Sequence, residues 1–151
     1  MASVNNMKAM LNRDTVKYLR IHGTEEWRKQ CLKKANYKCN ITGKEGCKKC
    51  PLDVHHKDVS FNSIMKKAHK KLNIQFHKLT IDYIAEDLAA LVDLIKKMHK
   101  DVEGVVIKHT LHMIFHESYG KKATAEDYKE FKKIEKTRQY KSKNGSYRKT
   151  A

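Results

Sequence analysis

The sequence has little of what breaks helices or crosses membranes. One Pro and six Gly occur in 151 residues, a composition that disfavours a turn-rich β-sandwich and favours helices. No apolar run reaches the roughly 18 residues of a membrane span, and the opening segment MASVNNMKAMLNRD lacks the apolar stretch of a signal peptide. We therefore expect a cytoplasmic protein without a membrane partner.

Acidic residues are also scarce. Asp and Glu number 17 against 33 Lys and Arg, which gives a formal net charge of +16 and a pI near 9.7. A field of this sign attracts polyanions, and neutralised phosphates release counterions, so nucleic acid is the expected partner. An anionic membrane would need an amphipathic helix with an exposed apolar face or a lipid signal, and the sequence shows neither.

Hydrophobic residues make up 40% of the chain, enough for the core of about one domain. Period-2 and β-branched patterns predict strands over 52–55 and 104–108. Helical spacing predicts helices over about 25–34, 61–72, 81–99 and 109–119, with one more after Thr124. The fold class is therefore α+β and mostly helical.

Several local signals bound these helices. Thr24 is a candidate cap for the first one, Thr124 and Asp127 resemble a capping box, and Gly120 suits a left-handed helix end. The helix over 81–99 should turn one apolar stripe inward. That stripe consists of Ile81, Ile84, Leu88, Leu91, Ile95 and Met98.

Four histidines form two pairs with different geometry. His112 and His116 are four residues apart on a predicted helix, so both imidazoles can face one ion. His55 and His56 are adjacent at the end of a predicted strand, so their side chains point to opposite faces. That geometry favours a division of labour in which one histidine binds metal and the other handles a proton. Phosphodiester hydrolysis needs both, and a histidine titrates near working pH.

The segments that carry these histidines resemble a known nuclease motif. Asp53-Val-His-His-Lys-Asp58 and Ile107-Lys-His-Thr-Leu-His-Met-Ile-Phe-His-Glu-Ser-Tyr-Gly120 are similar to the two ends of an HNH (ββα-metal, His-Me finger) motif. Residues 39–43, 60–64 and 124–131 also resemble phage-type, free-standing HNH endonucleases. The resemblance covers about residues 25–131. It implies a mostly helical α+β domain around a ββα-metal motif, and a metal-dependent endonuclease that hydrolyses DNA phosphodiesters.

The resemblance also implies roles for individual residues. His56 would be the general base that activates water, and His55 and His112 would bind the metal. His116 would complete a three-imidazole site. For the middle residue of the motif, which would orient His56, His99 is the first candidate and Glu103 the second.

The identity of the ion and the cutting mode stay open in the sequence. Imidazole-rich sites prefer Zn, Ni, Co or Mn to Mg in raw affinity, while cellular abundance favours Mg or Mn. The expected cofactor is therefore a divalent ion, with Mg, Mn, Ni and Zn all considered. The expected partner is double-stranded DNA. Whether the protein is a monomer or a homodimer, and whether it nicks or cuts both strands, is not decided.

The cysteines allow a second metal. Cys47 and Cys50 form a CxxC pair, and Cys31 and Cys39 precede them. Four thiolates could hold a structural zinc, although only one close pair is present and Cys31 falls among core-like helix positions, where Cys behaves as a small hydrophobe. The sequence therefore allows either a structural zinc or packed, metal-free thiols.

The domain organisation follows from these patterns. We expect a basic arm or helix over 1–24, the HNH nuclease domain over 25–131 and a flexible basic tail over 132–151. Phosphate contacts are expected from basic side chains beside the histidines and in the tail. They are Lys57, Lys108, Arg138, Lys141, Lys143 and Arg148.

Two other functions compete with the nuclease. One is a catalytically silent, HNH-fold protein that binds nucleic acid in a regulatory role. The other is a zinc-knuckle binding module centred on residues 39–50, which would hold stoichiometric zinc, unfold with chelator and cut nothing. A complete set of base and ligand histidines argues for the enzyme, since neither alternative requires it.

Overall fold

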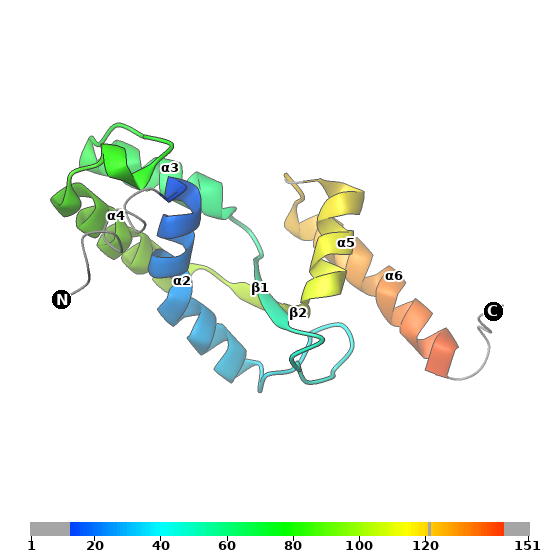
Figure 1. The fold of residues 1–151 in the computed structure, drawn as a ribbon. Helices are drawn as coiled ribbons and strands as arrows, with labels where there is room; N and C mark the ends of the chain where they lie inside the picture. The colour runs from blue at the N-terminus through cyan, green and yellow to red at the C-terminus, as the bar shows by residue number, and fades with distance from the viewer. Residues whose placement is uncertain (1–12, 121, 144–151) are drawn as a thin grey trace. The chain divides into compact units, whose positions relative to one another are not determined.

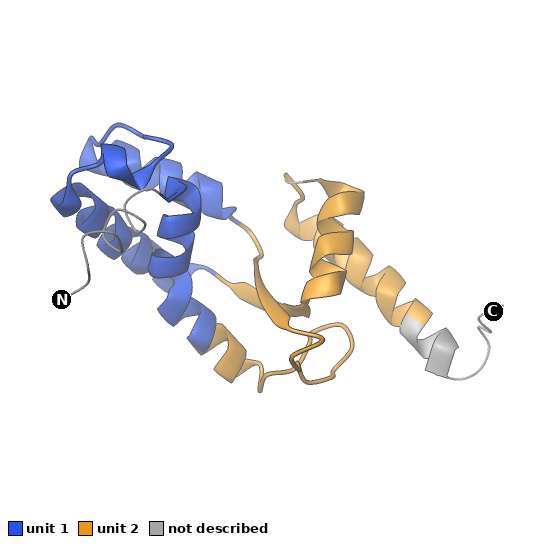
Figure 2. Cartoon of the chain, in the orientation of Figure 1, with its two compact units in different colours: residues 1–29, 59–102 blue, residues 30–58, 103–151 orange. Residues whose placement is uncertain are grey.

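The computed structural model describes residues 13–120 and 122–143 (Figure 1). The chain forms two compact units (Figure 2), each made of two separate stretches of sequence. Unit 1 comprises residues 1–29 and 59–102, and unit 2 comprises residues 30–58 and 103–151. The fold is α+β, as predicted, with one two-stranded sheet among the described residues. None of the described helices is long and apolar enough to cross a membrane.

Unit 1 is helical. It contains most of α2 (Thr15–Lys34), then α3 (Phe61–Leu72), α4 (Ala85–Met98), and the short 3-10 helices η1 (Thr80–Asp82) and η2 (His99–Asp101). Ser60 caps α3 by accepting a hydrogen bond from the backbone N–H of Ser63. The apolar side chains of these helices form one core. It consists of Leu19, Phe61, Ile64, Met65, Ala68, Tyr83, Leu88, Leu91 and Ile95.

Helix α2 begins at Thr15, whereas the sequence indicated a start near Glu25. Asp14 supplies the N-terminal cap, because its Oδ1 accepts the N–H of Lys17. Gly23 stays helical although glycine usually weakens helices. A Cβ there would lie 2.6 Å from Cγ2 of Ile95, so the close approach of α4 requires a residue without a side chain.

The predicted inward stripe over 81–98 is correct only in part. Leu88, Leu91 and Ile95 are buried, but Ile81 and Ile84 are 49% and 61% exposed. The physical reason is that α4 starts at Ala85, and the chain before it forms the 3-10 turn η1. Thr80 and Tyr83 are the buried residues of that segment.

Unit 2 contains the sheet. Strand β1 (Leu52–His56) pairs antiparallel with β2 (Gly104–Lys108), with Val54 opposite Val106 and His56 opposite Gly104. Helix α5 (His109–Tyr119) follows β2 without a break and contacts both strands. Both strands and α5 were predicted within one residue of their observed bounds. The unit therefore places a helix directly against a two-stranded sheet.

Helix α6 (Ala125–Lys143) closes the core of unit 2. The predicted capping box is present: Thr124 N–H donates to Asp127 Oδ2 at 2.9 Å, and Asp127 N–H donates to Thr124 Oγ1 at 3.2 Å. The helix continues to Lys143, so residues 132–143 are helical where the sequence indicated a tail. The unit's core consists of Cys39, Ile41, Leu52, Val105, Val106, Ile107, Leu111, Phe115, Tyr128 and Phe131.

Candidate metal centre

Strand β1 presents two functional side chains to α5. Asp53 and His55 are two residues apart, so they lie on the same face of the strand. Both touch histidines of α5: Asp53 Oδ2 lies 3.0 Å from His112 Nδ1, and His55 Nδ1 lies 3.3 Å from His112 Nε2. The strand thus supplies one carboxylate and one imidazole to the same helix.

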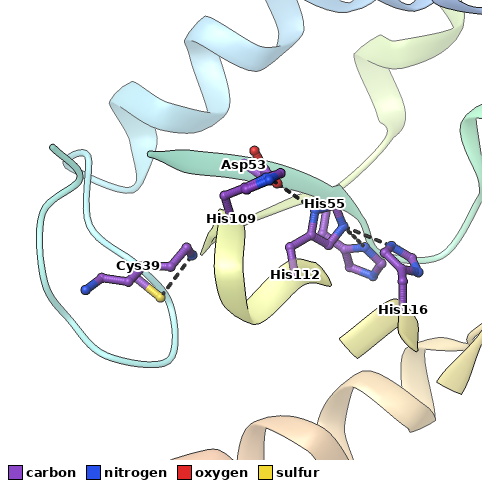
Figure 3. A network of polar contacts seen from close by, with 7 residues as sticks. Cys39, Asp53, His55, His109, His112 and His116 are labelled. Atoms are coloured by element: carbon purple, nitrogen blue, oxygen red, sulfur yellow. Dashed lines mark hydrogen bonds and ion pairs between the residues drawn. The ribbon is translucent and has the colours of Figure 1, made fainter. Parts of the chain in front are cut away.

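Helix α5 supplies the other imidazoles. His109, His112 and His116 recur at helical spacing, so they share the face that contacts β1. His116 Nε2 lies 2.9 Å from His112 Nε2. Figure 3 shows the rings of His55, His112 and His116 converging, with Asp53 and His109 beside them.

The three converging histidines form a group that could hold a metal ion. One nitrogen each from His55, His112 and His116 lies within 4.8 Å of the others. Imidazole nitrogens 2.0–2.1 Å from a tetrahedral ion would lie roughly 3.3 Å apart. The separations of 3.3 Å and 2.9 Å from His112 Nε2 are close to that requirement. The metal ligands expected from the sequence are therefore brought together by the fold.

The outer nitrogens fix the tautomers of two ligands. His112 Nδ1 donates to the Asp53 carboxylate, and His116 Nδ1 donates to the carbonyl oxygen of Gly120 at 3.3 Å. A neutral imidazole carries one proton, so both Nε2 atoms then present lone pairs. Two lone pairs 2.9 Å apart repel unless a cation lies between them. This arrangement matches the chemistry of a metal site, whose histidine ligands donate their other N–H to an acceptor.

His55 sits against an aromatic wall. Its ring stacks on Tyr128 at an interplanar angle of 26° and meets Phe115 edge-on at 82°. Its Nε2 atom is buried and has no hydrogen-bond partner among the described residues, so Nδ1 is the nitrogen that can reach an ion. Burial, and then the charges of His112 and His116, lower the pKa of His55 to about 4. The ring is neutral at pH 7, as metal binding requires.

The wall itself is held by hydrogen bonds to the loop before β1. The hydroxyl of Tyr128 donates to Asn40 Oδ1 at 3.1 Å, and the backbone N–H of Asn40 donates to Val106 O at 2.7 Å. The side chain that covers His55 is therefore tied through Asn40 to β2. This packing keeps the His55 ring from rotating.

The expected general base, His56, and the first candidate for the residue that would orient it, His99, belong to different units. His56 is partly buried at the end of β1, on the strand face opposite to that of His55. His99 is completely buried in unit 1, where Nδ1 donates to Ile95 O at 2.7 Å and the ring meets Trp27 edge-on. Glu103, the second candidate, belongs to unit 2 and pairs with Lys57.

The four cysteines are not brought together as a metal site. Among the described residues, the only group of three or more metal-binding side chains is the histidine group. Cys39 is buried, and its Sγ accepts hydrogen bonds from the N–H groups of Thr42 and Lys108. Cys31 packs against the core of unit 2. Of the two alternatives left open by the sequence, the arrangement favours packed, metal-free thiols: Cys39 is buried, Cys50 is half-buried and Cys47 is exposed.

The basic residues expected to hold phosphate lie in varied surroundings. The Lys57 ammonium pairs with Glu103 at 3.2 Å, and exposed Arg138 pairs with Glu135 at 3.5 Å. Lys108 is partly exposed at the end of β2. Arg148 lies outside the described residues, as do the side chains of Lys141 and Lys143.

Two features of the site were not predicted from the sequence. The sequence places Asp53 on the predicted strand and in the HNH-like segment but assigns it no role, and its position two residues before His55 is the available signal. Lys132 on α6 was assigned to the tail. Burial, and then the nearby ammonium groups of Lys136 and Lys57, lower the pKa of Lys132. Because Lys57 directly follows β1, this group of positive charges lies near the end of that strand.

Comparison of the chain with protein-family models found no match, and comparisons with curated proteins and with solved structures likewise found none. The site itself consists of three imidazoles that could hold a divalent metal ion, and the outer nitrogens of two of them donate to acceptors.

Proposed function

We propose that this protein is a metal-dependent DNA endonuclease of the HNH type. The observation that carries the proposal is the convergence of His55, His112 and His116 from a strand and a helix. Their order along the chain, with a strand that bears His55, an antiparallel partner strand and then the helix, is the order expected of a ββα-metal motif. The resemblance of the sequence around these histidines points the same way.

The side chains divide the chemistry between binding and proton transfer. His55, His112 and His116 would hold the ion, and a bound divalent ion neutralises charge that develops on the phosphate and the leaving oxygen. His56 would accept a proton from water, because a neutral imidazole is a base of suitable strength near pH 7. The aromatic wall formed by Phe115 and Tyr128 holds His55 in place, so that its Nδ1 stays directed at the ion.

The charge of the protein supports a nucleic-acid substrate. The net charge of +16 gives sequence-independent attraction to phosphates. Within unit 2, the charge of Lys132 interacts with those of Lys136 and Lys57. Neighbouring positive charges repel one another and attract polyanions, so this cluster favours binding of a phosphate backbone. Double-stranded DNA is proposed from the resemblance of the motif.

Cleavage of supercoiled plasmid tests this function. Wild-type protein is incubated with Mg²⁺, Mn²⁺, Ni²⁺ or Zn²⁺, or with EDTA, beside His56→Ala and His112→Ala. Nicked or linear product that depends on metal and is lost in both variants, with their circular dichroism unchanged, would support the enzyme. Folded wild-type protein that binds plasmid and leaves it intact with every ion would favour the silent binding protein instead.

A further inference from the structure

We propose that Asp53 is a positioning residue that holds the ring of His112 in the orientation and tautomer needed to bind the metal. The inference rests on the metal centre proposed above and assigns it an outer carboxylate. Figure 3 shows Asp53 on β1 beside His109 and His112 of α5, on the side of His112 away from the converging nitrogens. Asp53 itself does not belong to the group of side chains that could hold the ion.

The geometry gives Asp53 one defined function toward His112. Oδ2 of Asp53 lies 3.0 Å from Nδ1 of His112, while Nε2 of the same ring faces His55 and His116. An ionised carboxylate only accepts hydrogen bonds, so Nδ1 must carry the proton and Nε2 must present its lone pair. With the opposite tautomer, the N–H would point at the ion and prevent binding.

The three ligands differ in what supports them. Among the described residues, Asp53 is the one charged acceptor behind a ligand nitrogen: His116 Nδ1 has the neutral carbonyl of Gly120, and His55 Nε2 has no hydrogen-bond partner. A carboxylate behind a ligating imidazole raises its basicity and fixes the ring. Because His112 Nε2 is the nitrogen closest to both others, loss of its support should weaken the whole group.

Two histidine nitrogens share one oxygen of Asp53. His112 Nδ1 lies 3.0 Å from Oδ2, and His109 Nδ1 lies 2.6 Å from the same atom. His109 is about half exposed and does not belong to the metal group. It therefore offers a control on the same helix and the same carboxylate.

The test measures metal affinity rather than cleavage. Folded full-length protein is titrated with Zn²⁺ against a chromophoric chelator, and the visible absorption of its Co²⁺ complex is recorded. The variants are Asp53→Asn and Asp53→Ala, and the controls are His109→Gln and Asp58→Asn. Asp58 is an exposed carboxylate just after β1, so its substitution removes a nearby charge without removing the support of His112.

We expect the Asp53 variants to bind Zn²⁺ about 10- to 100-fold more weakly, the usual effect of losing an outer partner. The Co²⁺ band should shift in both, while the two controls stay within about twofold of wild type. A purely structural role would lower the thermal midpoint and leave the affinity and the band of the folded protein unchanged. That result, or an equal loss in Asp58→Asn, would overturn the proposal.

The outcomes also separate this inference from the proposed function. If the wild-type protein binds no metal, both the proposed metal centre and the proposed role of Asp53 are overturned. Wild-type protein that binds metal with equal affinity after Asp53→Asn and Asp53→Ala would overturn the inference alone. Metal binding that depends on Asp53, in a protein that never cleaves DNA, would overturn the nuclease and support the role of Asp53.

Discussion

Substitution of His116 by Gln tests the metal centre through stability. His116 is a suitable position because its ring is only partly buried and its outer nitrogen bonds the carbonyl of Gly120 at the end of its own helix. The substitution therefore removes one ligand and leaves the core of Phe115, Tyr128 and Phe131 intact. Any change in metal-dependent stability can then be assigned to the lost imidazole.

The expected size follows from linkage. A ligand that binds only the folded state at 100 times its dissociation constant stabilises it by about 2.7 kcal/mol. For a chain of this length that corresponds to a rise of roughly 5 to 11 °C in the thermal midpoint. If His116→Gln weakens metal binding about 100-fold, the same metal concentration stabilises the folded variant by only about 0.4 kcal/mol. The thermal midpoint of the variant then rises by roughly 1 to 2 °C.

The assay is thermal unfolding followed by circular dichroism, with Zn²⁺ or Ni²⁺ added to wild type, His116→Gln and His22→Gln. His22 lies on α2 beside Tyr18, in unit 1, and controls for weak surface binding by any histidine. The wild type and His22→Gln should respond alike, and His116→Gln should respond little. An equal rise in all three proteins would refute the three-histidine centre.

Three further predictions concern the cysteines, Gly23 and His99. The double variant Cys47→Ser/Cys50→Ser should bind as much zinc as the wild type when both are measured by native mass spectrometry, because these thiols do not belong to the metal group. Loss of one zinc from the variant would instead support a zinc site formed by the cysteines. Gly23→Ala should lower the free energy of unfolding by about 1 to 3 kcal/mol in urea, since the new Cβ would overlap Ile95, and a neutral or stabilising result would contradict the contact. Burial lowers the pKa of His99, and the hydrogen bond to the Ile95 carbonyl opposes this effect. Just below pH 6.5 the unfolded chain therefore binds a proton at His99 that the folded protein does not bind. The free energy of unfolding should fall as the pH drops from 7 to 5, by at most about 1.4 kcal/mol per pH unit. His99→Asn should make that slope shallower when Trp27 fluorescence follows unfolding, and an unchanged slope would show that His99 is not responsible.

Local patterns were sufficient for the elements that carry the candidate ligands. Alternation and β-branching located both strands, and helical spacing located α5 together with the pair His112 and His116. These signals work because strand and helix periods determine which side chains share a face. The nearness of His55 to this pair could not be read from periodicity, because it depends on the register that places His55 opposite Val105.

The misjudged positions depend on contacts between distant residues. The sequence predicts a helix that starts near residue 25, but the helix already includes Gly23, where the side chain of Ile95 from another helix leaves no room for a Cβ. Alternation predicts Asp53 as a polar position of a half-buried strand, but its two hydrogen-bond partners, His109 and His112, lie more than 50 residues further along the chain. The spacing of Asp53 and His55 indicates that they share a strand face, but it does not indicate which histidines contact Asp53. Only the assembled strand and helix reveal them.

Part of unit 1 is inserted in the sequence between the two strands of the candidate centre. Residues 59–102, which belong to unit 1, lie between β1 and β2 of unit 2. Lys57 and Glu103 join the two ends of this insertion twice, through a backbone hydrogen bond of 3.1 Å and an ion pair of 3.2 Å. The register of His56 opposite Gly104 begins directly beside that junction. The end of the strand pair that faces the insertion is therefore held by contacts within unit 2 itself, one between backbone atoms and one between the Lys57 ammonium and the Glu103 carboxylate.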